Sequence, residues 1–298
     1  MVTTIAGGIL MMIIIVTVHE LGHLLVARAC GVGVESFSIG FGWWSFKMFT
    51  IKGIPFYFRP ILLGGFVKIK SRELKNAVSD GKYLEEALWW QKILFFAAGV
   101  GFNLITAVVL RTLIFWFAPA DTQVHILQLK FAFLQVPDWY MAPFYAIKIT
   151  CLSFIDYFFK TVEGIRFICW KTVAGLIASL WTFLAGSSIP GAVPFTPIPN
   201  AGMAGQVGLG ANAHLGFWSF VGLVYLVSIM IAALNILPLR PFDGGHIVIT
   251  LLERIFGDNR ITRFITAVTT YAGLFIVIVI LFNMLMSDGT DLYRFIKK

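Results

Sequence analysis

Charged side chains are scarce in this sequence, and their scarcity excludes most soluble folds. Only 13% of the 298 residues are Asp, Glu, Lys or Arg, whereas 58% are hydrophobic. The apolar residues gather in long blocks rather than in the stripes of a soluble amphipathic domain. The sequence therefore predicts a membrane protein that crosses the bilayer several times.

Acidic residues are the scarcer of the two charged classes, which leaves a formal net charge of +8. An excess of positive charge can indicate nucleic-acid binding, but here the Lys and Arg residues lie between the hydrophobic blocks. The cytoplasmic loops of membrane proteins carry such an excess. We therefore expect the lipid bilayer, and no nucleic acid, among the partners of this protein.

Cysteine pairs are missing as well. Cys30, Cys151 and Cys169 form no C-x-x-C motif and are too scattered for a cysteine zinc cage, so we interpret them as packing residues. The first apolar run also lacks a basic segment before it and a cleavage site of small residues after it. It is typical of a retained first transmembrane helix rather than of a signal peptide.

The apolar run from Ile5 to Ala29 contains the motif His19-Glu20-Leu21-Gly22-His23. Ionisable residues are rare within a membrane unless they pair, bind a metal or line a wet cavity. A spacing of four places both imidazoles on one helix face, with Glu20 beside them. Two neutral imidazoles can bind zinc, and the carboxylate can accept a proton from a metal-bound water. The motif therefore predicts a hydrolytic site with one zinc ion.

A catalytic zinc site usually has three protein ligands, so a distant third ligand is needed. Asp243 is the best candidate, because Pro238 and Pro241 interrupt a spanning block just before it. Asp243 could instead cap a helix, and His246 is a rival ligand. Asn235 precedes the break, where its amide could donate to a substrate carbonyl or an oxyanion, or could simply pack between helices.

The second spanning block, which opens near Ile93, contains Gly99, Gly101 and Asn103. The two glycines permit close contact between helices. Asn103 is the lone polar residue there, and a hydrogen bond from it could tie this helix to the first one. We expect a packing role for Asn103 rather than a chemical one.

A β element is expected between the first two spanning helices. Residues 46–59 are β-prone around a Lys-Gly turn, which indicates a hairpin. Gly64 and Gly65 follow, and they let the backbone approach a neighbour closely. A free strand edge at Gly64, Gly65 and Phe66 would hold an extended substrate peptide by main-chain pairing. The alternative is a simple membrane-dipping anchor, and the sequence does not separate the two.

The predicted fold class is an all-α polytopic membrane protein of about four transmembrane helices, with a membrane-associated β-hairpin or small sheet. Residues 1–118 would form the first transmembrane pair, with the β element at about 37–70. Residues 215–298 would form the second pair. Four crossings bring Asp243 to the same side of the membrane as the two histidines.

Residues 119–214 would form an external region between the two pairs. Residues 144–186 are hydrophobic but carry regularly spaced charges, and a Gly/Pro-rich loop follows at residues 187–210. A crossing by residues 144–186 would move Asp243 to the opposite leaflet. We therefore interpret this segment as an interfacial or re-entrant helix.

These motifs, in this order, resemble those of the site-2 protease family of intramembrane zinc metalloproteases, most closely its bacterial regulator-of-sigma-E protease branch. The matching segments are residues 19–23, 37–42, 63–68, 90–94, 205–208 and 235–245. The resemblance implies that His19, His23 and Asp243 bind zinc, that Glu20 is the general base and that Asn235 positions substrate. Residues 46–70 would be the membrane-inserted element that grips an unwound substrate.

The resemblance also implies an enzyme of regulated intramembrane proteolysis in the bacterial inner membrane. Its substrates would be single-pass membrane proteins, such as anti-sigma factors or remnant signal peptides. The segment after Ala118 is too short for the PDZ domains of that branch, so we expect a member without them. The alternative is a non-catalytic zinc-containing membrane binder or chaperone, against which Glu20 argues. A metal transporter would need several ligand clusters, and the sequence has one.

Overall fold

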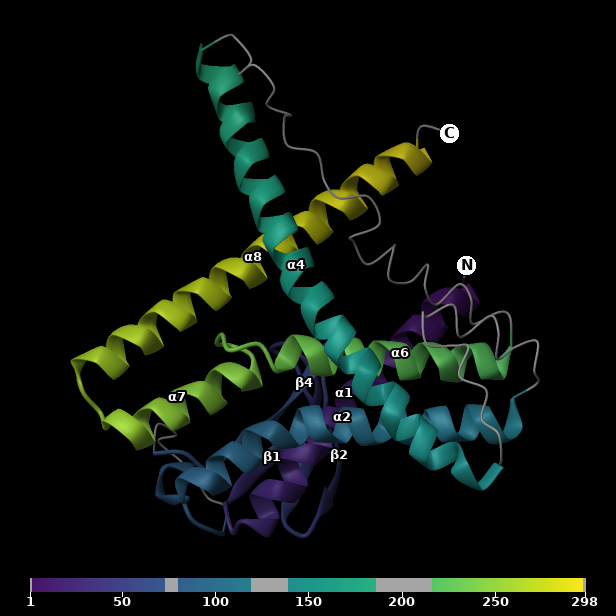
Figure 1. Cartoon of the computed structure of the whole chain (residues 1–298), viewed down its shortest axis with the longest axis vertical. Helices are drawn as coiled ribbons and strands as arrows, with labels where there is room; N and C mark the ends of the chain where they lie inside the picture. Colours follow the sequence, from purple (N-terminus) through teal and green to yellow (C-terminus); the bar gives the residue numbers. More distant parts are fainter. Residues whose placement is uncertain (1, 73–79, 119–138, 186–215, 297–298) are drawn as a thin grey trace.

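A computed structural model describes residues 2–72, 80–118, 139–185 and 216–296, and most of them are helical (Figure 1). Among these residues, four helices are long and apolar enough to cross a membrane. They are α1 (Val2–Ala29), α2 (Trp89–Phe117), α6 (Phe217–Asn235) and α8 (Arg260–Ile296). Together with a small four-stranded sheet, they confirm the predicted fold class.

Helix α2 is central to the bundle, because it packs against α1, α4, α6 and α7. It runs antiparallel to α1, and the two backbones meet where Gly22 faces Ala98. A Cβ atom at Gly22 would lie 2.6 Å from the carbonyl oxygen of Ala98. Small residues permit this close approach of membrane helices. The contact brings the face of α1 that carries His19 and His23 against α2.

The sheet has the strand order β2-β3-β1-β4. Its strands are β1 (Val34–Phe41), β2 (Phe46–Ile51), β3 (Ile54–Phe58) and β4 (Ile61–Ile69). Strands β2 and β3 form the predicted hairpin, and the turn at Lys52 and Gly53 has positive φ angles of 48° and 80°. Strand β1 pairs parallel to β3 and antiparallel to β4. Strand β4 is therefore an edge of the sheet.

The sheet packs onto the end of α1 through one apolar cluster. Phe37 of β1 and Ile54 of β3 are buried with Leu24 of α1 and Phe95 of α2. Burial of such side chains contributes roughly 1.5–3 kcal/mol each. Strand β4 lies directly along α1. The sheet is therefore held next to the helix that carries the H-E-x-x-H motif.

The predicted break after the third span lies between α6 and α7 (Asp243–Phe256). Gly244 and Gly245 pack directly against the backbone of the connecting residues. A Cβ atom at Gly244 would overlap the carbonyl of Ile236, and one at Gly245 would overlap the backbone of Leu239. The absence of side chains there lets the connection fold over the first turn of α7. This packing fixes the position of Asp243.

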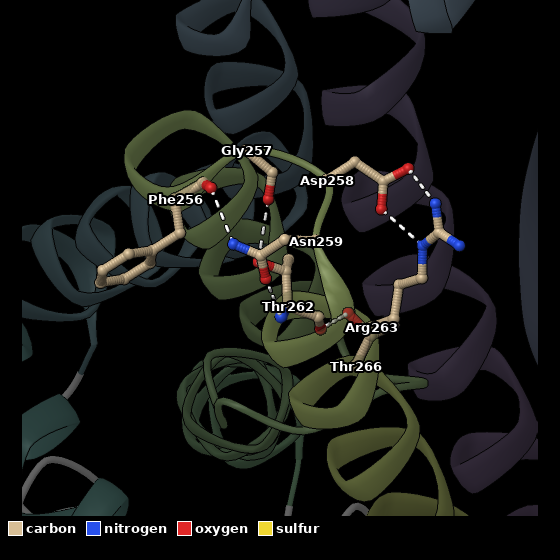
Figure 2. A network of polar contacts seen from close by, with 7 residues as sticks. All are labelled: Phe256, Gly257, Asp258, Asn259, Thr262, Arg263 and Thr266. Carbon is tan, nitrogen blue, oxygen red and sulfur yellow. Dashed lines mark hydrogen bonds and ion pairs between the residues drawn. The ribbon is translucent and has the colours of Figure 1, made fainter.

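A network of polar contacts closes the turn from α7 to α8 (Figure 2). The Asn259 side chain accepts a hydrogen bond from the Thr262 backbone N–H at 2.9 Å and donates one to the carbonyl of Phe256 at 2.9 Å. Asp258 pairs with Arg263 beside them. An Asn that accepts from the first turn of a helix stabilises its start. The network thus sets the direction in which α8 leaves α7.

Helix α4 (Ala142–Ala185) is a single helix of 44 residues. It crosses α2 and α6 obliquely, and its C-terminal part extends well beyond them (Figure 1). Thr172 accepts a hydrogen bond from Asn283 of α8 at 2.6 Å. Helix α4 is not among the candidate spans of the described residues, and its interfacial or re-entrant placement stays a prediction. The predicted loop at residues 187–210 lies outside the described residues.

Short 3₁₀ turns precede two of the long helices. One is η1 (Leu84–Glu86), before α2, and the other is η2 (Trp139–Met141), before α4. Most of the segment that links α2 to α4 lies outside the described residues, and the absence of a PDZ domain stays a prediction.

Candidate metal centre

Three side chains from distant parts of the chain meet in the bundle: His19 and His23 of α1, and Asp243 at the start of α7. The Nε2 atoms of His19 and His23 lie 3.2 Å and 3.4 Å from Oδ2 of Asp243. The two Nε2 atoms are 3.3 Å apart. Within the described residues, this is the one group of three or more His, Cys, Asp or Glu side chains that could hold a metal ion.

The triangle of these atoms matches the dimensions of a zinc site. With zinc–ligand bonds of ~2.0–2.1 Å, tetrahedral geometry places ligand atoms roughly 3.3–3.4 Å apart. All three sides of the triangle lie close to this value. Oδ2 of Asp243 is buried and makes no well-directed hydrogen bond, although two imidazole nitrogens face it. A cation shared by the three atoms would satisfy it, so these residues fit zinc.

Gly99 of α2 makes room for this cluster. A Cβ atom at Gly99 would lie 2.5 Å from Cε1 of His19 and 2.5 Å from Nε2 of His23. Gly101 differs, because a Cβ atom there would meet nothing within 4 Å. The two glycines that the sequence offered as equivalent contact points are therefore distinct, and only Gly99 faces the histidines.

The outer nitrogen of His23 has a backbone partner. Nδ1 of His23 lies 2.8 Å from the carbonyl oxygen of Phe95, to which it can only donate. The proton therefore resides on Nδ1, and the lone pair of Nε2 points toward Asp243. The outer nitrogen of His19 lies 3.3 Å from the amide nitrogen of Asn103.

The surroundings of His246, near the start of α7, favour its neutral form. Burial, reinforced by the charge of Arg240, lowers the pKa of His246 to about 4. His246 stacks on Phe96 and accepts a hydrogen bond from Arg240 at 3.1 Å. It is thus placed outside the triangle that Asp243 completes.

Glu20 lies between the histidines and the edge strand. Its side chain interacts with both imidazoles, with Asp243 and with the backbone of Val67 in β4. A Cβ atom at Gly65 would lie 3.2 Å from Cγ of Glu20 and 2.9 Å from Cγ1 of Val16. The backbone of β4 therefore passes directly beside Glu20 because Gly65 has no side chain.

The other predicted substrate-contacting residues are placed differently. Phe66 stacks on Phe41, and a Cβ atom at Gly64 would meet that same Phe41 ring. Since side chains alternate along a strand, Gly64 and Phe66 face away from Glu20 while Gly65 faces it. Asn235 is the last residue of α6, and its amide donates to the carbonyl of Ile231 at 3.0 Å. Among the described residues, no hydrogen bond or ion pair links Asn235 to the triangle.

Several named proteins share part of this sequence. A Helicobacter pylori (strain J99) protein named "Putative zinc metalloprotease" is 40% identical over 34% of this chain and 30% of its own length. Metalloprotease MmpA of Caulobacter vibrioides is 43% identical over 24% of this chain and 18% of its own. Protease RseP of Yersinia pestis is 33% identical over 38% and 25%. Residues 7–280 match peptidase family M50, and the chain belongs to this family.

Proposed function

We propose that this protein is an intramembrane zinc metalloendopeptidase, in which His19, His23 and Asp243 bind one zinc ion and Glu20 is the general base. The observation that carries the proposal is the triangle of ligand atoms 3.2–3.4 Å apart, built from a spanning helix and the segment after a helix break. Peptidase family M50 is zinc-dependent, and four apolar helices make the chain an integral membrane protein.

The chemistry requires a polarised carbonyl and an activated water. Zinc, when bound, supplies both, since it acts as a Lewis acid and lowers the pKa of its water toward about 7. Glu20 would take the proton from that water and pass it to the leaving amine nitrogen. The carbonyl of Phe95 would keep His23 in the tautomer that binds zinc, and the amide of Asn235 would donate to the substrate carbonyl.

The substrate would be held along β4. A peptide bond within a helix is already hydrogen-bonded and shielded, so a transmembrane substrate must unwind before it is cleaved. An edge strand offers main-chain N–H and C=O groups to such an extended segment. The backbone of β4 at Gly65 adjoins Glu20, which would place a paired peptide next to the general base.

The proposed substrates are single-pass membrane proteins of the anti-sigma-factor or remnant-signal-peptide class, in the inner membrane of a bacterium. This proposal rests on the likeness of the motifs to those of the regulator-of-sigma-E protease branch. A bacterial relative named protease RseP is compatible with it. Proteomic comparison of membranes with and without the active protein would identify the substrates.

Replacement of Glu20 by glutamine tests the catalytic proposal. The purified protein is reconstituted in liposomes with a single-pass reporter, and the cleavage site is located by mass spectrometry. Loss of a general base reduces the rate by about 10²–10⁴-fold. We expect this loss in Glu20→Gln with wild-type zinc content, because Glu20 is not part of the ligand triangle. Equal cleavage by both forms would refute the assignment, and reporter binding without cleavage by wild type would indicate the non-catalytic binder.

Gly65→Ala tests the role of the β4 edge. The added Cβ would lie 2.7 Å from the carbonyl oxygen of Ser38 in β1 and 2.9 Å from Val16 in α1, so β4 must shift relative to both. A displacement of about 1 Å near a reacting centre can cost roughly 10²-fold in rate. We expect a loss of that order in the liposome assay, with zinc content unchanged because no ligand lies on β4. Wild-type cleavage by this variant would argue against β4 as the substrate-holding strand.

A further inference from the structure

We infer that Asn103 of α2 is a positioning residue, which holds the imidazole of His19 in the tautomer that can bind zinc. The inference rests on the zinc site proposed above and assigns Asn103 a role beyond helix packing. Asn103 is fully buried within a spanning helix, and its side-chain amide lies 3.3 Å from Nδ1 of His19. The opposite ring nitrogen, Nε2, faces Oδ2 of Asp243 at 3.2 Å.

The two nitrogens of His19 therefore have different tasks. A neutral imidazole carries one N–H and one lone pair. If Nε2 offers its lone pair to a metal, Nδ1 must carry the proton, and a buried N–H needs an acceptor. The side chain of Asn103 is the group recorded at hydrogen-bonding distance from this nitrogen in the described structure.

The oxygen of the Asn103 amide can serve as that acceptor. Oδ1 is buried without a hydrogen-bond partner, while Nδ2 is the atom placed near His19. Rotation of the amide by 180° exchanges the positions of Oδ1 and Nδ2, and the two orientations of the group have nearly the same shape. An Nδ2 donor would leave the proton on Nε2, in the middle of the ligand triangle. Zinc binding therefore selects the amide orientation in which Oδ1 of Asn103 accepts a hydrogen bond from Nδ1–H of His19.

The position of Asn103 on α2 supports this role. Phe95, Gly99 and Asn103 are spaced four residues apart, so they share one face of the helix. The carbonyl of Phe95 accepts from His23, Gly99 leaves room for both rings, and the amide of Asn103 meets His19. The backbone carbonyl of Asn103 also accepts a hydrogen bond from Ser228 of α6 at 3.1 Å. One face of α2 thus contacts both histidines.

The two histidines differ in a way that makes the inference testable. His23 is held by a backbone carbonyl, which a substitution does not remove, whereas His19 is held by a side chain. Asn103→Leu keeps the approximate size of the side chain and removes the acceptor. Asn103→Asp keeps the acceptor and removes the donor. A packing role would tolerate leucine better than aspartate, and a positioning role predicts the reverse.

The test measures zinc affinity of the full-length protein in detergent by competition with a chelator, and the d–d absorption of bound Co²⁺ as a report on ligand geometry. Loss of an outer partner of a ligating histidine weakens metal binding by about 10–100-fold. We expect a loss of that order and an altered Co²⁺ spectrum for Asn103→Leu, and affinity near that of wild type for Asn103→Asp. Ser228→Ala is the matched control, because it removes only the contact to the backbone of Asn103 and should leave zinc affinity unchanged.

Two results would overturn the inference: wild-type zinc affinity in Asn103→Leu, or a loss of zinc affinity of about 10–100-fold in Asn103→Asp. The Asp variant decides the question alone if the Leu variant does not fold, which thermal unfolding of the metal-free proteins would reveal. A wild-type protein that binds no zinc would instead refute the proposed zinc site, and the inference with it. The two failures are therefore distinguishable.

Discussion

Alanine in place of Asp243 is expected to release zinc from the protein and to reduce cleavage of a membrane reporter to background. Asp243 supplies the corner of the triangle that lies outside α1, at 3.2 Å and 3.4 Å from the two imidazoles. Without it, two histidines remain, and a catalytic zinc site usually needs three protein ligands. The loss of affinity should exceed the roughly 10–100-fold cost of losing an outer partner.

The measurement is the zinc content of the protein purified in detergent, paired with the liposome cleavage assay. Asp258→Ala is the matched control, since Asp258 is an acidic residue of the same part of the chain that pairs with Arg263 on the surface. Exposed ion pairs contribute little to stability, so this control should retain zinc and activity. Full zinc retention by Asp243→Ala would mean that the third ligand lies elsewhere.

Gly99→Ala is expected to have an effect of similar size although it replaces no ligand. The new methyl group would lie 2.5 Å from Cε1 of His19 and 2.5 Å from Nε2 of His23. Carbon atoms pack at about 3.5–4.0 Å, so the rings must move by roughly 1 Å or the helices must separate. Either change breaks a triangle whose sides match zinc geometry. Zinc content and cleavage should both fall to near background.

Gly101→Ala is the control for this prediction. It lies on the same helix, and its added methyl group would meet nothing within 4 Å. Alanine is the better helix former by about 0.5–1 kcal/mol, so the variant should fold as well as wild type and keep its zinc. Equal zinc content and cleavage in Gly99→Ala and Gly101→Ala would show that α2 does not contact the histidines at Gly99.

Much of the fold was predictable because it follows local patterns. Long apolar runs mark the four spanning helices, and a Lys-Gly turn between β-prone segments marks the β2–β3 hairpin. Strand order was not predictable in this way. Strand β1 inserts between β3 and β4, and the pairing of β1 with β3 is parallel. Non-local strand pairings of this kind depend on side-chain packing against α1, and no periodic pattern in the sequence indicates them.

The same distinction between local and non-local features applies to the candidate site. The H-E-x-x-H motif is local, so its geometry follows from helix periodicity alone. Asp243 was predicted from the proline break before it, and the number of crossings placed it on the same side as His19 and His23. The structure brings the three side chains together. The sequence ranked Asn103 as a packing residue and did not separate Gly99 from Gly101. Those distinctions depend on how α2 is rotated against α1.

The sequence by itself determined that the chain is a membrane protein of apolar helices with a His-Glu-His motif inside the first one. Composition and periodicity are sufficient for this, because lipid demands long apolar helices and makes a buried charge conspicuous. Only the tertiary structure decided which face of α2 lies against the histidines, which strand passes Glu20 and where Asp243 points. These are contacts between residues far apart in the chain, and they are set by close packing at glycines and by the turn that precedes α7.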